Sequence, residues 1–153
     1  MAAVSERLKA LGLELPEPPA PVALYRPARV VGSLCFTAGQ LPFRAGRLLA
    51  EGRVGREVDV ATAWEGARQA ALNAMAAAAA AAGGVDRLAG VVQVVGYVQS
   101  AEDFHQQAEV LNGASSLFVE LFGDAGGHVR SAVGVAALPL NAAVEVECIF
   151  ALE

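Results

Sequence analysis

The sequence has few of the residues that bind metals, form disulfides or hold nucleic acid. Only two cysteines and two histidines occur in 153 residues, too few and too widely spaced for a disulfide scaffold or a metal site. Eleven Lys and Arg against sixteen Asp and Glu give a formal net charge of −5. Because binding to phosphate backbones needs a basic surface, no nucleic-acid partner is expected. We expect Cys35 and Cys148, each in an alternating apolar segment, to be small buried hydrophobes.

Long apolar runs are also missing, although 55% of the residues are hydrophobic. Alanine accounts for 33 of them, and no stretch of about 18 strongly apolar residues occurs. The start of the chain carries Glu6, Arg7 and Lys9, which interrupt the apolar stretch that a signal peptide needs. We therefore expect a soluble, cytoplasmic protein that does not contact the membrane. The length predicts a single domain over residues 1–153, with residues 1–20 as an N-terminal extension.

The hydrophobic pattern predicts strands that alternate with two long helices. Helices are expected from the N-cap Asp59 to about 82 and at 102–122, a short helix or a lid at 5–12, and a proline-rich extended stretch at 15–21. Strands are expected at 30–38, 47–49, 91–99, 129–138 and 142–152, the last two joined through residues 139–141. In segment 91–99, alternation places Val92, Val94 and Val98 on one face. Two helices cover only one face of a sheet. A monomer would expose apolar side chains on the other face, so we expect self-association.

The last two predicted strands hold the most informative charges. Arg130 is the only charged residue of segment 129–138, where it shares a face with Ala132, and Glu145 and Glu147 share a face of the final strand. A lone arginine in an apolar strand needs an anion. Two explanations remain open. Arg130 pairs with one of the glutamates across a hairpin and fixes the strand register, or it binds a substrate carboxylate while a glutamate moves protons.

One histidine lies close to this arginine. In a regular strand His128, two residues before Arg130, points the same way, and its neutral ring can accept a proton. We favour a solvated histidine at the start of the strand. Ser115, Ser116 and Thr37 have no base nearby in the sequence, so a serine–histidine triad is not expected.

Several segments together resemble a known family. They are Tyr25, the sequence FTAGQLP at 36–42, RSAVGVAALP at 130–139 and VEVE at 144–147. In this combination the chain resembles the reactive-intermediate deaminase family, RidA/YjgF, also called L-PSP, over roughly residues 25–150. The resemblance implies the chorismate-mutase-like α/β sandwich, a mixed sheet with two helices on one face. It also implies homotrimers whose sheets build a central barrel, with one ligand pocket at each subunit interface.

The resemblance also implies a reaction and a set of site residues. Arg130 would bind the substrate carboxylate, Glu145 would orient or activate water, and Tyr25 would belong to the pocket. Further substrate-binding positions are Gly39, Ala38, Ala132, Asn112 and, because it shares a face with the arginine, His128. The implied reaction is the hydrolysis of enamine or imine intermediates of the 2-aminoacrylate type to a 2-oxo acid and ammonia, with no cofactor and no metal. An imine carbon is already electrophilic, so gripping the carboxylate, positioning water and moving a proton suffice.

The chain departs from the family pattern at the pocket. Ala38 stands where the family often has serine or threonine, Ala132 where it often has cysteine, and residues 128–129 are His-Val where the deaminases usually have Pro-Ala. These changes predict a divergent branch. They also keep open a non-catalytic trimer that binds 2-oxo acids or similar carboxylates. A ribonuclease, a label that the family has carried, is disfavoured by the net negative charge.

Overall fold

A five-stranded sheet with helices on one face forms the fold of the computed structural model, which describes residues 2–20 and 24–153. The strand order is β1-β2-β7-β5-β6, in which β5 and β6 run parallel and the other neighbours antiparallel. The strands of this sheet are β1 (Ala28–Val31), β2 (Leu34–Thr37), β5 (Leu88–Gln99), β6 (Val129–Val135) and β7 (Val144–Leu152). The predicted α/β class with a mixed sheet and two helices on one face is confirmed.

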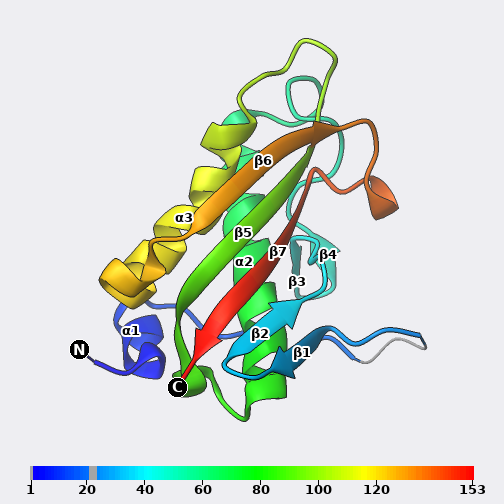
Figure 1. The fold of residues 1–153 in the computed structure, drawn as a ribbon. Helices are drawn as coiled ribbons and strands as arrows, with labels where there is room; N and C mark the ends of the chain where they lie inside the picture. Colours follow the sequence, from blue (N-terminus) through cyan, green and yellow to red (C-terminus); the bar gives the residue numbers. More distant parts are fainter. Residues whose placement is uncertain (1, 21–23) are drawn as a thin grey trace.

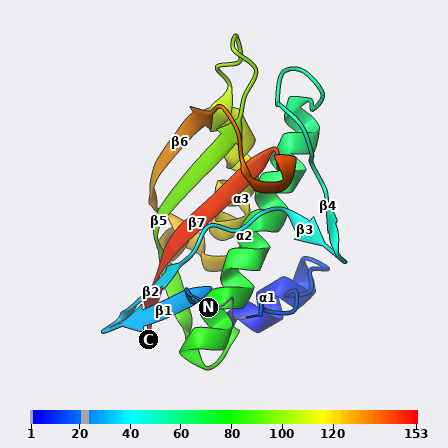
Figure 2. The same ribbon diagram turned by 90° about the vertical axis from the view of Figure 1, so that its right-hand side faces the viewer.

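Helices α2 (Val60–Ala82) and α3 (Gln107–Phe122) lie side by side behind the sheet in Figure 1 and on one side of it in Figure 2. Asp59 caps α2 as predicted, because its carboxylate accepts a hydrogen bond from the Thr62 amide at 2.8 Å. The two helices approach closely at Gly113 of α3, where a Cβ would overlap the backbone carbonyl of Trp64. No helix within residues 2–20 and 24–153 has the length and apolarity that a membrane span requires.

The remaining elements pack around α2 and α3. A short helix, α1 (Val4–Ala10), buries Val4 and Leu8, and Arg7 donates from Nη1 to the Leu121 carbonyl at the end of α3. The chain then runs past α2 to residue 20, and Pro21, the last residue of the predicted proline-rich stretch, lies outside the described residues. Strands β3 (Phe43–Arg44) and β4 (Arg47–Leu48) form a separate small hairpin.

Three sequence predictions need correction. The predicted strand at 30–38 is a hairpin, because a turn at Gly32, whose φ is 59°, separates β1 from β2. The helix predicted from Glu102 begins at Gln107. A register shift between Val91 and Gln93 turns Val92 outward, so that Val91 shares the buried face with Val94.

The order of the last strands is also different from the predicted one. Strands β6 and β7 do not form a hairpin, because β5 lies between them and pairs with both. The connection β5–α3–β6 is instead a strand–helix–strand crossover, which explains why β5 and β6 are parallel. Strand β6 is therefore an edge of the sheet, and the face opposite the helices stays uncovered in one copy (Figure 1).

Candidate functional site

Arg130 lies on the edge strand β6 and points toward helix α3. Its Nη1 donates to Asn112 Oδ1 at 2.9 Å and to Ser115 Oγ at 3.0 Å, two side chains one helical turn apart. Its register partner on β5 is Val94, which is fully buried beneath the helices, so Arg130 belongs to the helix-covered face. The guanidinium is therefore held at the rim between β6 and α3 by two neutral oxygens.

A histidine and a serine extend this group. His128 Nε2 lies 2.9 Å from Ser115 Oγ, and His128 Nδ1 lies 2.7 Å from the Gly126 carbonyl oxygen. The ring also packs edge-on against Phe118, at 6.0 Å between centroids. His128 is thus half-buried with both nitrogens in hydrogen bonds, which corrects the prediction of a solvated histidine. No base lies near Ser115 in the sequence, but the turn after α3 brings His128 back beside it in space.

Glu145 lies on the other face of the sheet. Its neighbours Val144 and Val146 are buried under the helices, so alternation directs Glu145 and Glu147 to the uncovered face. Burial, and secondarily the charge of Glu147, raises the pKa of Glu145 above its usual range. On the same face the Tyr97 hydroxyl donates to Glu147 Oε1, and this hydrogen bond is the main reason that the pKa of Tyr97 rises to about 12.

Gly39 lies directly against Glu145. Segment 38–42 runs beside β7, where Gln40 and Val146 exchange backbone hydrogen bonds of 2.8 and 3.0 Å. This pairing brings Gly39 so close that a Cβ there would overlap Glu145 Oε1. Glycine is therefore required at position 39 for the Glu145 carboxylate to keep its place.

The structure divides the predicted site residues into two groups. Asn112, His128 and Arg130 come together between β6 and α3, and Ala132 follows Arg130 on the same face of β6. Glu145 and Gly39 come together on and beside β7, with the half-buried Ala38 next to Gly39.

The suggested pairing of Arg130 with Glu145 or Glu147 is wrong. The residues lie on opposite faces, β5 separates their strands, and among residues 2–20 and 24–153 Arg130 meets no carboxylate within ion-pair distance. Arg130 therefore does not set the strand register through an ion pair within one copy.

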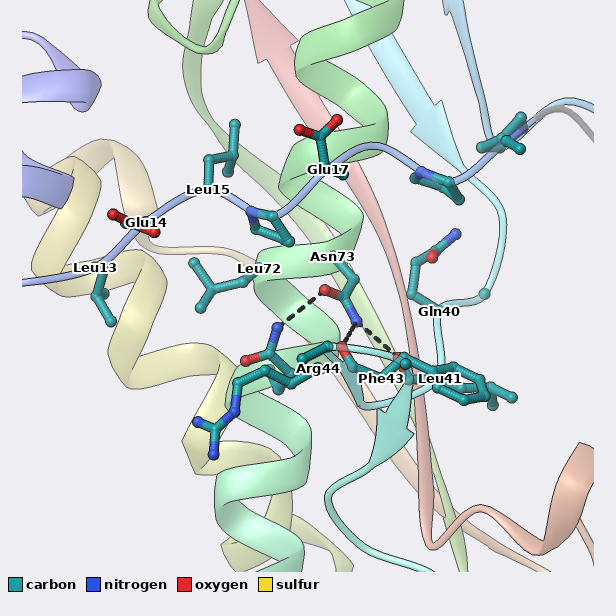
Figure 3. Close-up of a pocket in the computed structure, with 18 of the residues that line it drawn as sticks. Leu13, Glu14, Leu15, Glu17, Gln40, Leu41, Phe43, Arg44, Leu72 and Asn73 are labelled. Carbon is teal, nitrogen blue, oxygen red and sulfur yellow. Dashed lines mark hydrogen bonds between the residues drawn. The ribbon is translucent and has the colours of Figure 1, made fainter.

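Tyr25, which is 60% exposed, lines a cavity of about 1010 Å³. Gly39 also lines this cavity, whereas Arg130 and Glu145 do not. Figure 3 shows Leu13, Leu15 and Glu17 of the N-terminal segment on one side and Leu41, Phe43 and Arg44 on the other. Between them, Asn73 of α2 donates to the carbonyls of Leu41 and Phe43 at 2.9 Å each. This amide therefore fixes the end of segment 38–42, which carries Gly39.

Comparisons with known proteins decide the family. The family model described as "YjgF/chorismate mutase-like, putative endoribonuclease" matches residues 5–152. The chain belongs to the YjgF family. Protein TCP17 of Trypanosoma cruzi is 37% identical over 150 residues, which cover 97% of this chain and 94% of that protein.

Solved structures of similar proteins give the same fold. Atu1372 from Agrobacterium tumefaciens, whose function is unknown, matches with a TM-score of 0.90 and 40% identity over 98% of this chain and 92% of that one. Escherichia coli TdcF with bound serine matches with a TM-score of 0.62 and 25% identity over 90% and 94% of the two chains. The resemblance drawn from the sequence motifs is confirmed, and the lower TM-score with TdcF agrees with a divergent branch of the YjgF family.

Proposed function

We propose that this protein binds a small metabolite that carries a carboxylate and hydrolyses its enamine or imine group. The observation that carries the proposal is the environment of the Arg130 guanidinium. Its guanidinium is half-buried, fixed by Asn112 and Ser115, and not neutralised by a carboxylate among the described residues. A fixed, uncompensated guanidinium is a binding site for a planar anion. Serine, the ligand of TdcF, carries such a carboxylate, which supports the proposal.

The proposed site forms between two copies of the chain. Arg130 and Glu145 lie on opposite faces of one sheet, so one copy cannot apply both side chains to the same small molecule. The uncovered face beside β6 exposes Val129 and Val133, by 65% and 44%. An exposed apolar sheet face favours association with another copy. We propose a homotrimer in which Arg130 of one copy faces Glu145, Gly39 and Tyr25 of the next.

In the proposed reaction the protein mainly positions the substrate carboxylate and a water molecule. Arg130 holds the carboxylate, and Glu145, with its raised pKa, orients a water molecule and accepts a proton from it. Water adds to the imine carbon, the proton moves to nitrogen, and the C–N bond breaks to release a 2-oxo acid and ammonia. Each step uses side chains of the chain itself and requires no cofactor. In this proposal the enzyme acts in the cytoplasm on intermediates of amino-acid breakdown.

The test generates 2-aminoacrylate and related imino acids in place and follows the release of ammonia and 2-oxo acid. Wild type should accelerate release over the spontaneous rate, and Arg130→Ala should lose most of the acceleration. Arg56→Ala, which removes an exposed arginine of the loop before α2, is the matched control and should keep it. An unchanged spontaneous rate with wild type across several imino acids would reject the deaminase proposal.

A second function is favoured by Ala38 and Ala132. Both lack the hydroxyl or thiol that the family often carries at these positions, and both are half-buried in the two groups described above. A trimer that holds 2-oxo acids on Arg130 without further chemistry is consistent with these substitutions. Calorimetry with 2-oxo acids on wild type and Arg130→Ala tests it: heat lost in the variant supports binding by Arg130, and equal heats dismiss it.

A further inference from the structure

Ser115 has a geometry that the proposed imine hydrolysis does not use. Its Oγ lies 2.9 Å from His128 Nε2 and 3.0 Å from Arg130 Nη1, both within hydrogen-bonding range. We propose that Ser115 is a nucleophile, activated by His128, that cleaves esters carrying a carboxylate. The inference rests on the proposed function only in taking Arg130 as the group that binds the carboxylate.

The hydrogen bonds determine which nitrogen of His128 carries the proton. The Gly126 carbonyl can only accept, so His128 Nδ1, at 2.7 Å, donates to it. In the neutral ring Nε2 then has a lone pair available. Because Arg130 Nη1 donates to a lone pair of Ser115 Oγ, the hydroxyl hydrogen of Ser115 is directed to Nε2. Nucleophile, base and orienting group thus stand in the order that serine hydrolases use, with a backbone carbonyl in place of the acid.

The surroundings hold this arrangement in place and leave it accessible. His128 packs against the edge of Phe118, and Gly126 is buried so closely under α3 that a Cβ would overlap the Phe118 carbonyl. Ser115 is only half-buried, so its side chain is not sealed inside the core. A fixed base beside a reachable hydroxyl is the arrangement that nucleophilic catalysis requires.

Arg130 has two roles in the proposed reaction, one at Ser115 Oγ and one at the substrate carboxylate. Its positive charge beside Oγ stabilises the alkoxide character that develops when Ser115 loses its proton. Its Nη2 and Nε make no hydrogen bond within the described residues, so they remain available for a substrate carboxylate. Asn112 accepts from Arg130 through Oδ1, which leaves its amide N–H groups to donate to a developing oxyanion.

The reaction balances without a further reactant except water. Ser115 Oγ attacks the ester carbonyl carbon, and its proton passes to His128 Nε2. The tetrahedral intermediate collapses, the bond from carbon to the leaving oxygen breaks, and His128 returns the proton to the leaving alcohol. Water, deprotonated by His128, then attacks the acyl-serine, which releases the carboxylic acid and restores the Ser115 hydroxyl.

The first experiment labels wild type with a fluorophosphonate and maps the modified peptide by mass spectrometry. We expect the adduct on Ser115 and its loss in Ser115→Ala and His128→Gln. Ser116→Ala is the matched control and should leave labelling unchanged, because within the described residues Ser116 Oγ hydrogen-bonds to the Gly113 carbonyl, at 3.4 Å, and not to His128. No adduct on wild type, an adduct on another serine only, or equal loss in Ser116→Ala would overturn the proposal, and the wild-type result holds even if a variant does not fold.

The second experiment compares 3-acetoxy-4-nitrobenzoate with its uncharged counterpart, 2-nitrophenyl acetate. We expect kcat/KM for the charged ester to fall at least about 100-fold in Ser115→Ala and His128→Gln, the scale of lost base catalysis. Arg130→Lys should lose the preference for the charged ester; a preference retained in Arg130→Lys would overturn the role of Arg130. Imine hydrolysis is measured on the same samples. Ester cleavage without imine hydrolysis refutes only the proposed function, and the reverse refutes only this inference.

Discussion

Mixing two inactive variants distinguishes a site shared between copies from a site within one copy. The structure places Arg130 and Glu145 on opposite faces of the sheet, with β5 between their strands. A copy with Arg130→Ala still supplies Glu145, and a copy with Glu145→Gln still supplies Arg130. If each site takes one side chain from each of two neighbours, a mixed trimer contains intact sites although neither parent does.

The expected recovery follows from counting interfaces. An interface is intact when the copy that gives the guanidinium is Glu145→Gln and the copy that gives the carboxylate is Arg130→Ala. A mixed trimer, whichever variant supplies two of its copies, has this at one of its three interfaces, so the purified mixed assemblies should reach about a third of wild-type imine hydrolysis. Both variants are co-expressed with different tags, and mixed assemblies are purified through the two tags in turn.

The control is a pool of the two variants assembled separately, which should stay as inactive as either parent. The purified assembly also shows its copy number by light scattering, which should correspond to three chains. Mixed assemblies no more active than the parents would refute the shared site. Either parent alone retaining near wild-type activity would refute the assigned role of its substituted residue.

Three further predictions concern the uncovered face and the cavity. Burial raises the pKa of Glu145 in the folded protein above its usual range, so wild type loses stability as pH rises through that folded-state pKa; Glu145→Gln should be more stable than wild type at pH 7 and equal to it near pH 4, in urea unfolding. The raised pKa of Tyr97, about 12, means that wild type also loses stability between about pH 10 and 12, and Tyr97→Phe should lack this loss; a parallel pH profile would show that the hydrogen bond to Glu147 is not formed. Asn73→Ala removes the hydrogen bonds to the carbonyls of Leu41 and Phe43 and the one that Asn73 accepts from Gln69, and should lower the unfolding free energy by about 1–3 kcal/mol; an unchanged urea midpoint would show that water replaces the amide.

Local patterns in the sequence were enough to predict most elements of the fold. The α2 helix follows from an acidic N-cap at Asp59, a continuous run of good helix formers and a left-handed Gly83 at its end. Alternation also placed Glu145 and Glu147 on one face of β7 correctly. Alternation fails at Val92, because a bulge inserts one residue into the strand without any change in composition that would reveal it.

The arrangement of the site depends on which strands are neighbours, and the pattern of single strands does not contain that information. The short connection at 139–141 suggested a hairpin and hence an Arg130–glutamate pair. The predicted order strand–helix–strand for β5, α3 and β6 was the better guide to which strands are adjacent, because such a unit makes its two strands parallel neighbours. The same unit returns the chain antiparallel along α3, which places Ser115 beside His128. The sequence distance between Ser115 and His128 hides their contact. The helical spacing from Asn112 to Ser115 puts both side chains on the helix face that meets Arg130, and His128 shares the strand face of Arg130.

The two proposed activities should respond differently when the copies dissociate. Ser115, His128 and Arg130 lie within one copy, so ester cleavage requires only that the copy stays folded. In the proposed homotrimer, imine hydrolysis additionally requires Glu145 of a neighbouring copy. A charged residue in the apolar face, such as Val133→Asp, should weaken association and abolish imine hydrolysis while it leaves ester cleavage within about twofold of wild type. Light scattering reports the dissociation in the same sample. Equal loss of both activities in a folded, dissociated Val133→Asp protein would show that the serine site, too, is completed by a second copy.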